Sequence, residues 1–319
     1  MRMLVMGAGA LGTVVGGFMA KAGHDVTLVG RPRNMDAIRA HGLRITGIWG
    51  EHHVATVHPC AGVEELTPGA LDLVLLTVKS YDTHAAITSL APFLGPGTLV
   101  CSYQNGLGNA EVIAEVIGWP RTFGARAIFG AWLREPGWVE VTVIADPTAL
   151  GTYDPATPAE RVRAIAAAMN NAGIPTVYTD EIATVLWSKV TYNCALNPLS
   201  GLLDVPYGVL LETEHTRSIL REVVQEVYAV ADAMGVRLKP ATAESYIDLL
   251  FQVLIPPTAA HYASMREDFR RRRRTEIDAL NGAIVRHGEL HGVPCPTNSM
   301  LARLVRAREH ALSRSAANT

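Results

Sequence analysis

The sequence lacks the cysteine spacings that bind metal ions or form disulfide frameworks. Its four cysteines are scattered over 319 residues without a CxxC pair, at Cys60, Cys101, Cys194 and Cys295. Such an arrangement favours reduced thiols over a zinc site or a set of disulfides. We therefore expect a cytoplasmic protein without a structural metal ion.

The sequence also lacks a large excess of either charge, with 28 lysines and arginines against 30 aspartates and glutamates. A balanced chain produces no overall field that would attract nucleic acid or an anionic membrane. The apolar run at the N-terminus (MRMLVM) is soon interrupted by glycines, and it is too short for a signal peptide or a membrane span. We expect a small-molecule partner, with neither nucleic acid nor membrane.

The pattern in the first half of the chain is an alternation of strands and helices. Strand-length apolar runs occupy residues 2–6, 25–29, 71–78 and 98–103. Helix-like stretches lie between or after them, at 10–22, 83–90 and 109–117. This alternation predicts a parallel sheet covered on both faces. Residues 123–153 are rich in strand formers and predict strands added to the sheet edge, followed by a helix at 158–171 and a strand at 174–178.

A glycine-rich turn follows the first predicted strand and begins the first predicted helix. It reads Gly7-Ala-Gly9-Ala10-Leu11-Gly12. In a dinucleotide-binding fingerprint the first glycine makes the turn, the second lets the pyrophosphate approach the backbone, and the third lets helix and strand pack closely. The motif alone is weak, but its position between a strand and a helix indicates a cofactor site.

The end of the second predicted strand indicates which dinucleotide is bound. Enzymes that use NAD usually carry an acidic residue there, whereas this chain has Arg31 and Arg33. A guanidinium pairs with a 2′-phosphate that a carboxylate would repel, so NADPH is favoured over NADH. The alternative is that both arginines are solvated loop charges.

Lys79 and Asn105 each follow a predicted parallel strand, and ligands of this fold bind at the carboxyl ends of such strands. We expect both residues beside the glycine turn, where they would contact cofactor or substrate. Lys79 as an ordinary surface lysine, and Asn105 with Gly106 as a simple turn, remain alternatives.

The strand pattern nearly disappears after residue 180. Helical stretches are expected at 181–196, 212–234, 241–254 and 274–287. The sequence therefore predicts an α/β fold in which residues 1–180 form a Rossmann-type NADPH-binding domain and residues 181–319 form an all-α domain. The chain length and the 49% hydrophobic content suit two domains.

The first of these helices carries a polar stripe. Lys189, Asn193 and Asn197 are spaced by four residues, so they project from one face of a helix that is otherwise largely apolar. One lysine and two carboxamides can protonate a carbonyl substrate and hydrogen-bond to it. The alternative is an exposed polar face, although such a face more often carries charged residues than two asparagines.

The order and spacing of these motifs resemble the ketopantoate reductase family over essentially the whole chain. The matching motifs are GAGALG with Arg31, Val78-Lys79, QNGLG at 104–108, Trp187-Ser188-Lys189 with Asn193 and Asn197, RRTEID at 273–278, and Asn281-Gly282. The resemblance implies an oxidoreductase of pantothenate biosynthesis that reduces 2-dehydropantoate (ketopantoate) to pantoate with NADPH.

The resemblance also implies roles for individual residues. Lys189 would donate a proton to the ketone oxygen, and Glu276 would hold substrate hydroxyl groups and help to set the charge of the lysine. The remaining contacts are implied at Asn193, Asn197 and Ser264 for the substrate, and at Lys79 and Asn105 between nicotinamide and substrate. A lysine in an apolar cleft beside a carboxylate can be charged and still release its proton.

The chain departs from the family pattern in the five consecutive arginines from Arg270 to Arg274. They are either a solvated entry to a helix or a source of positive potential at the cleft mouth. The particular 2-oxo acid stays open, so another branched 2-oxo acid is an alternative substrate. A sensor that binds NADPH without turnover is a further alternative, which the presence of Lys189 and Glu276 disfavours. The abundance of apolar helix favours a homodimer.

Overall fold

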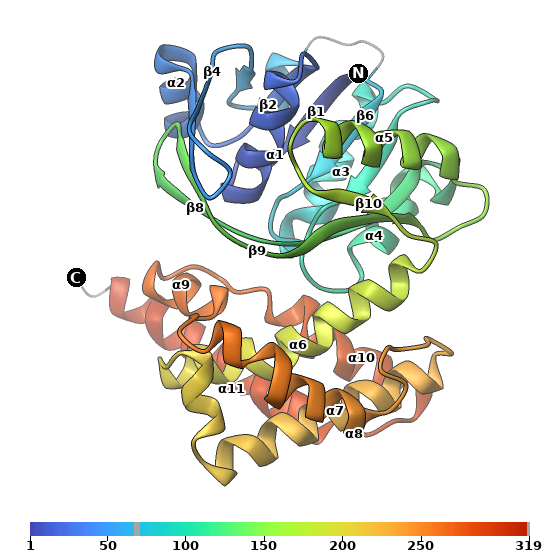
Figure 1. The fold of residues 1–319 in the computed structure, drawn as a ribbon, viewed down its shortest axis with the longest axis vertical. Helices are drawn as coiled ribbons and strands as arrows, with labels where there is room; N and C mark the ends of the chain where they lie inside the picture. Colours follow the sequence, from blue (N-terminus) through green and yellow to red (C-terminus); the bar gives the residue numbers. More distant parts are fainter. Residues whose placement is uncertain (67–70, 318–319) are drawn as a thin grey trace. The chain divides into compact units, whose positions relative to one another are not determined.

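The computed structural model describes residues 1–66 and 71–317, in which the chain forms two compact units. The first unit contains Met1–Gln104 and Asn109–Ile182, and the second contains Asn105–Gly108 and the chain from Ala183 onward. Chain colour distinguishes them in Figure 1, where the first unit runs mainly from blue to green and the second from yellow to red. The segment Asn105–Gly108 belongs to the helical unit although it follows a strand of the first.

Within the described residues the first unit contains a ten-stranded sheet. Its order is β4-β3-β9-β8-β7-β6-β1-β2-β5, with β10 paired to β9. The strands are β1 (Arg2–Met6), β2 (Asp25–Val29), β3 (Leu43–Gly47), β4 (His52–Val54), β5 (His58–Cys60), β6 (Leu73–Leu76), β7 (Leu99–Ser102), β8 (Thr122–Glu135), β9 (Trp138–Thr152) and β10 (Thr176–Tyr178). Pairing is parallel from β5 to β8, whereas β8 with β9 and β3 with β4 are antiparallel.

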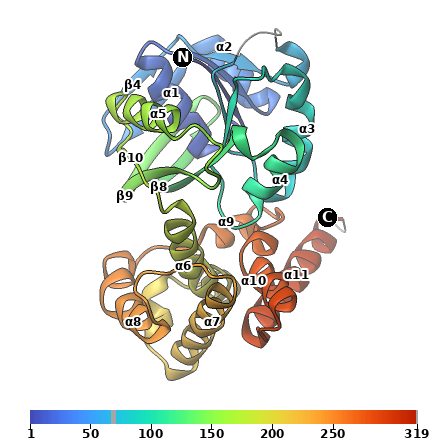
Figure 2. The same cartoon turned by 90° about the vertical axis from the view of Figure 1, so that its right-hand side faces the viewer.

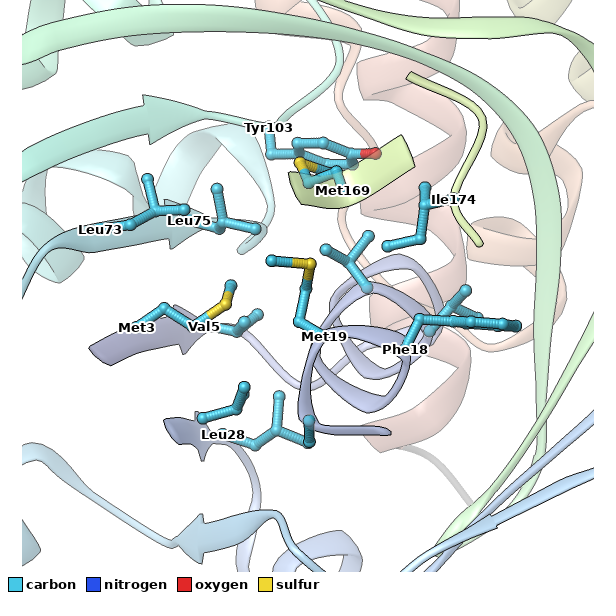
Figure 3. Packing of buried hydrophobic residues seen from close by; sticks show 14 of the residues in the cluster. Met3, Val5, Phe18, Met19, Leu28, Leu73, Leu75, Tyr103, Met169 and Ile174 are labelled. Atoms are coloured by element: carbon cyan, nitrogen blue, oxygen red, sulfur yellow. The ribbon is translucent and has the colours of Figure 1, made fainter. Parts of the chain in front are cut away.

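Helices cover both faces of this sheet, as the sequence pattern predicts. They are α1 (Ala10–Lys21), α2 (Pro32–His41), α3 (Thr83–Leu90), α4 (Asn109–Ile117) and α5 (Ala159–Asn171). Because side chains alternate along a strand, Leu73 and Leu75 of β6 pack in the core formed with α1 and α5, while Val74 and Leu76 pack in the core formed with α3 and α4. Figure 3 shows Leu75 on the side of Met19 of α1, with Leu73 beyond Leu75, in the first of these cores.

The prediction that residues 123–153 add strands to the sheet edge is wrong. These residues form the long hairpin of β8 and β9, but β9 also pairs in parallel with β3, so the hairpin lies inside the sheet. The sequence pattern does not predict strands β3 and β4. Leu43 and Ile45 of β3 are fully buried, and this burial supplies the packing that holds β3 against the hairpin.

The second unit is helical, as the sequence predicts, and Figure 2 shows its helices turned by 90° about the vertical axis from the view of Figure 1. Its helices are α6 (Ile182–Leu203, whose first residue lies in the first unit), α7 (Glu214–Ala233), α8 (Ala243–Leu249), α9 (Ser264–Arg270), α10 (Asn281–His291) and α11 (Pro296–Ala317). The expected helix at 241–254 is α8 followed by a π-helical turn at Leu250–Leu254, and the one at 274–287 begins later, as α10. Among the described residues, no helix is both long and apolar enough to span a membrane.

Helix α6 continues to Leu203, past the end that we expected near residue 196. Pro198 lies inside it and has no N–H to donate to the carbonyl of Cys194, four residues earlier. Asn281 Nδ2 donates to that carbonyl instead, at 3.0 Å. A side chain from α10 therefore satisfies the acceptor that proline leaves open, and the helix continues.

Candidate active site

The turn after β1 needs glycine at two of its three glycine positions. Gly7 has a φ of +114°, and a Cβ there would lie 2.6 Å from the amide nitrogen of Val78. A Cβ at Gly12 would lie 2.5 Å from Oγ1 of Thr77, which donates to the Gly7 carbonyl at 2.7 Å. The neighbouring strand end therefore excludes larger side chains from both positions.

Gly9 has no such internal reason to be glycine. Its φ of −77° is ordinary, and a Cβ there would meet no atom within 4 Å. Gly9 is the N-cap of α1 and has no side chain to accept a hydrogen bond from the first turn of the helix. The N–H groups of Ala10 and Leu11 therefore face the N-terminal end of α1, where the helix dipole stabilises an anion. The open space over Gly9 fits the approach of a pyrophosphate to the backbone.

Arg31 and Arg33 lie at the N-terminus of α2, which the sequence analysis did not predict. Arg31 is the N-cap, Pro32 is the first helical residue, and both arginines are exposed. Asn34, one residue on, ties this end to the glycine turn, because its Nδ2 donates to the Ala8 carbonyl at 3.1 Å. Two guanidiniums and a helix N-terminus form a site that suits a phosphate dianion.

Lys79 follows β6 in the first unit, where it is half-buried and precedes the short 3₁₀ turn Ser80–Asp82. The nearby Gln104 is buried, and its Nε2 donates to the Val78 carbonyl at 2.9 Å and to Thr83 Oγ1 at 2.8 Å. These bonds fix the backbone that presents Lys79.

The segment that carries Asn105 packs on the helical unit. Gly106 has a φ of +89°, and a Cβ there would lie 2.6 Å from the Cβ of Ala279. The N–H of Leu107 donates to the Ala279 carbonyl at 2.8 Å, and the side chain of Leu107 is part of the helical core. The close backbone approach therefore holds Asn105 against the residues that follow Glu276.

Lys189 on α6 meets Asn105 directly. Its Nζ donates to Asn105 Oδ1 at 2.7 Å, and the lysine is half-buried. An ammonium group has only donors, so the amide oxygen must face it, and the Asn105 amide N–H₂ group must point elsewhere. The Asn105 side chain thus holds the ammonium in place.

Asn197 lies about two turns after Lys189 on α6 and is buried, and a hydrogen bond to its side-chain oxygen orients its amide, as one does for Asn105. The hydroxyl of Tyr207 donates to Asn197 Oδ1 at 2.7 Å. Burial raises the pKa of Tyr207, with a smaller contribution from Tyr192, so the hydroxyl keeps the proton that it donates. Tyr207 therefore fixes which way the amide of Asn197 points. Asn193 lies between these turns, on the same helix, and is half-buried.

Asn105 and Asn197 both line a small pocket of about 10 Å³ within the helical unit. Its lining residues are Asn105, Asn197, Ser264, Met265, Asp268, Glu276 and Leu280. Ser264 and Met265 begin α9, and Glu276 precedes the short 3₁₀ turn Ile277–Ala279. The pocket has room for about one water molecule, so a larger ligand requires its lining to move apart.

The pocket brings together four residues that the sequence singles out, namely Asn105, Asn197, Ser264 and Glu276, and Asn105 connects them to Lys189. Asn193 shares α6 with Asn197 and Lys189 but does not line the pocket. Gly7, Gly9, Ala10, Leu11, Gly12, Arg31 and Lys79 belong to the first unit.

Two residues of the site, Asp268 and Tyr207, are not predicted by the sequence motifs. Asp268 is only 2% exposed, lines the pocket and pairs with Arg273 at 2.8 Å. Its position four residues after Ser264, on the same helix face, is the signal that could have revealed it. Tyr207 carries no comparable signal, because its contact with Asn197 depends on the loop after α6.

Comparisons with known proteins show which family the chain resembles. Two family models match the chain, "Ketopantoate reductase PanE/ApbA" over residues 3–155 and "Ketopantoate reductase PanE/ApbA C terminal" over residues 181–309. The 2-dehydropantoate 2-reductase of Aquifex aeolicus is 37% identical over 309 residues, which is 97% of each chain.

Solved structures have the same fold. A PanE/ApbA family ketopantoate reductase from Ralstonia eutropha JMP134 matches with a TM-score of 0.88 and 33% identity, over 98% of this chain and 100% of that one. A D-mandelate dehydrogenase solved with NADH and anilino(oxo)acetate matches with a TM-score of 0.87 over 98% and 100% of the two chains, and at 24% identity it supports the fold alone. With both family models matched and a relative of this identity over nearly the full length, the chain belongs to the ketopantoate reductase family.

Proposed function

We propose that this protein reduces 2-dehydropantoate to pantoate with NADPH. The observation that carries the proposal is the pairing of Lys189 with Asn105 next to a pocket that also contains Asn197, Ser264 and Glu276. A proton donor, two oriented amides and a carboxylate are the groups that reduction of a hydroxylated 2-oxo acid requires. Membership of the ketopantoate reductase family supports this choice of substrate.

The first unit binds the cofactor in this proposal. The N-terminus of α1 at Gly9 holds the pyrophosphate, and Arg31 with Arg33 holds the 2′-phosphate that distinguishes NADPH. Bound NADPH supplies the hydride that the ketone carbon accepts. Lys79, at the end of β6, would contact the bound cofactor.

Lys189 supplies the proton. As the ketone carbon gains the hydride, the C=O π electrons move to oxygen, which takes a proton from the Lys189 ammonium and becomes the product hydroxyl. The neutral amine then regains a proton from solvent. Asn105 Oδ1 accepts from the ammonium and so keeps Nζ in place before the transfer.

Glu276 and the amides hold the substrate. Glu276 is 9% exposed and lines the pocket, where its carboxylate accepts from substrate hydroxyl groups and favours the charged form of Lys189. Asn193, Asn197 and Ser264 donate to the substrate. Tyr207 occupies Asn197 Oδ1, which leaves the amide N–H₂ as the part that binds substrate oxygen.

We also propose that the protein works in the cytoplasm as a homodimer. Helix α11 exposes Met300 and Leu304, which are one turn apart and more than 45% exposed, as a contact between copies would require. Sedimentation equilibrium checks this. A single species with the mass of one chain, 34.3 kDa, at micromolar concentration would contradict it.

The test of the proposed function is a panel of 2-oxo acids assayed with NADPH, following the loss of nicotinamide absorbance. We expect the highest kcat/KM with 2-dehydropantoate, and much lower values with analogues that lack its hydroxyl group, because Glu276 would lose its partner. A higher kcat/KM with another branched 2-oxo acid would show that this acid, and not 2-dehydropantoate, is the preferred substrate. Tight NADPH binding without turnover of any panel member would indicate a sensor and contradict the proposal.

A further inference from the structure

The helical unit contains a second, larger cavity with strongly positive walls. Its volume is about 210 Å³, and its charged lining residues are Arg266, Arg270, Arg272, Arg308 and Asp204. Arg266 and Arg270 come from α9, Arg272 from the loop after it, Arg308 from α11 and Asp204 from the end of α6. Four positive charges and one negative charge leave the lining with a net charge of +3.

Two of the guanidiniums are already held in place. Arg266 pairs with Asp204 and stacks on the ring of Tyr262 at 3.7 Å. Arg308 donates from Nη1 to the Leu202 carbonyl at 2.7 Å and lies 4.9 Å from the ring centroid of Phe269. A guanidinium has five N–H donors, so both keep donors for a ligand, and neither has much freedom left to lose when one binds.

The other two arginines are more exposed and lie on either side of Arg271. Arg270 ends α9, and its Nη1 lies 3.9 Å from Glu267 Oε1, which is too long for a close ion pair. Arg272 has a φ of +51°, a left-handed conformation that residues other than glycine rarely adopt. The loop accepts this strain and places a further positive charge at the cavity.

A role in stabilising the fold explains only one of the four arginines that line this cavity. Arg308 binds a carbonyl at the C-terminal end of α6, where a positive side chain complements the helix dipole. One arginine is enough for that purpose. Four guanidiniums around one cavity repel one another unless an anion lies between them.

We propose that this cavity is a binding site for the phosphate group of a small polyanion. Phosphate fits because its oxygens match the fork of the guanidinium, and a dianion or a pyrophosphate neutralises most of the +3 charge. A single carboxylate would leave two positive charges without compensation. Within the run of five arginines, Arg273 and Arg274 instead form ion pairs with Asp268 and Asp278.

Helix α9 separates this cavity from the candidate active site. Ser264, Met265 and Asp268 line the active-site pocket, while Arg266 and Phe269 line the phosphate site. Phosphate binding therefore changes the position of a helix that also contacts the substrate, and it changes the KM for the 2-oxo acid. This consequence rests on the proposed function, whereas the binding itself does not.

Isothermal titration of the full-length protein with inorganic pyrophosphate tests the site. Saturating NADP⁺ keeps the glycine turn occupied, and chloride holds the ionic strength constant. We expect binding that R270Q/R272Q weakens by on the order of tenfold or more. The control R286Q/R303Q removes the same charge from exposed positions of α10 and α11 outside the cavity, and should weaken binding less than about twofold.

Further variants and ligands complete the test. R270K/R272K keeps both positive charges but loses the forked pair of guanidinium donors. We therefore expect a folded protein whose affinity for pyrophosphate lies between those of the unmodified protein and R270Q/R272Q. Titration with adenosine diphosphate separates a phosphate ester from free pyrophosphate, and tighter binding of either one identifies the source. No binding to the unmodified protein, or equal weakening in R270Q/R272Q and R286Q/R303Q, would overturn the proposal. If pyrophosphate binds but no 2-oxo acid is reduced, the proposed function fails and the phosphate site stands.

Discussion

Asn281 and Pro198 allow a direct test of how helix α6 is held together. Asn281 is fully buried, and its Nδ2 donates to the Cys194 carbonyl at 3.0 Å and to Asn298 Oδ1 at 2.9 Å. Asn281→Ala would leave two buried acceptors unpaired, at about 1–3 kcal/mol each, while it removes an Oδ1 atom that has no partner in the native protein. We expect a net destabilisation of about 2–4 kcal/mol.

Pro198→Ala supplies the missing donor, because an alanine N–H at position 198 can bond to the Cys194 carbonyl. In the Asn281→Ala background this change should recover about 1 kcal/mol, and in the native background it should have a smaller effect. The two substitutions are therefore expected to couple, with the double variant more stable than additivity predicts.

Hydrogen exchange of α6 peptides, followed by mass spectrometry, measures the local stability of this helix in each variant. Asn281→Ala should speed exchange across residues 190–200, and Pro198→Ala should slow it again. Asn170→Ala is the matched control, because Asn170 Oδ1 accepts from Thr176 N–H in the first unit, at 3.3 Å. Unchanged α6 exchange in Asn281→Ala, or strictly additive effects in the double variant, would refute the role of Asn281.

Three further predictions concern the cofactor, the substrate and pH. Arg31→Asp should narrow the NADPH/NADH ratio of kcat/KM by about tenfold or more, because the 2′-phosphate loses its cation and meets a carboxylate; an unchanged ratio would show that the phosphate site is misplaced. Glu276→Ala should raise KM and lower kcat in steady-state assays, because the carboxylate holds the substrate in ground and transition states; a change in kcat alone would contradict this. Burial, followed by Arg286, lowers the pKa of His287 from 6.5, so the folded state disfavours the protonated form. The stability from neutral His287 is present above pH 6.5 and is lost as the pH falls below it, so the thermal midpoint should fall less with acid in His287→Gln than in the native protein. The exposed His310→Gln should not share this effect.

Local patterns in the sequence predict much of the first unit. Helices α3 and α4 begin and end at the expected residues, because each has a short apolar face between polar or glycine-containing turns. The glycine turn is similarly recognisable. The atoms that exclude a side chain at Gly7 and Gly12 belong to the neighbouring strand end, which is present wherever a strand, a turn and a helix are arranged in this way. These features depend on contacts that are close in sequence or fixed by the fold class.

The sequence predicts less where the partner of a residue is distant. Helix α6 continues past Pro198 only because Asn281, 83 residues later in the chain, supplies a hydrogen-bond donor. Local helix propensity therefore predicts that the helix ends earlier than it does. Asn105 follows a strand of the sheet but packs with the helical unit through Ala279. Neither contact follows from periodicity, since each depends on how the helices pack in three dimensions.

The pH dependence of Lys189→Ala tests the central claim, that Lys189 is the proton donor. We expect kcat to fall by about 10² to 10⁴ while NADPH affinity is nearly unchanged, and Lys189→Arg not to restore it, because a guanidinium keeps its proton. In the native enzyme, reduction should decline at alkaline pH as the ammonium loses its proton, and this limb should be absent from Lys189→Ala. A Lys189→Ala enzyme with near-native kcat and the alkaline limb intact would remove Lys189 from the chemistry and leave its bond to Asn105 a structural contact.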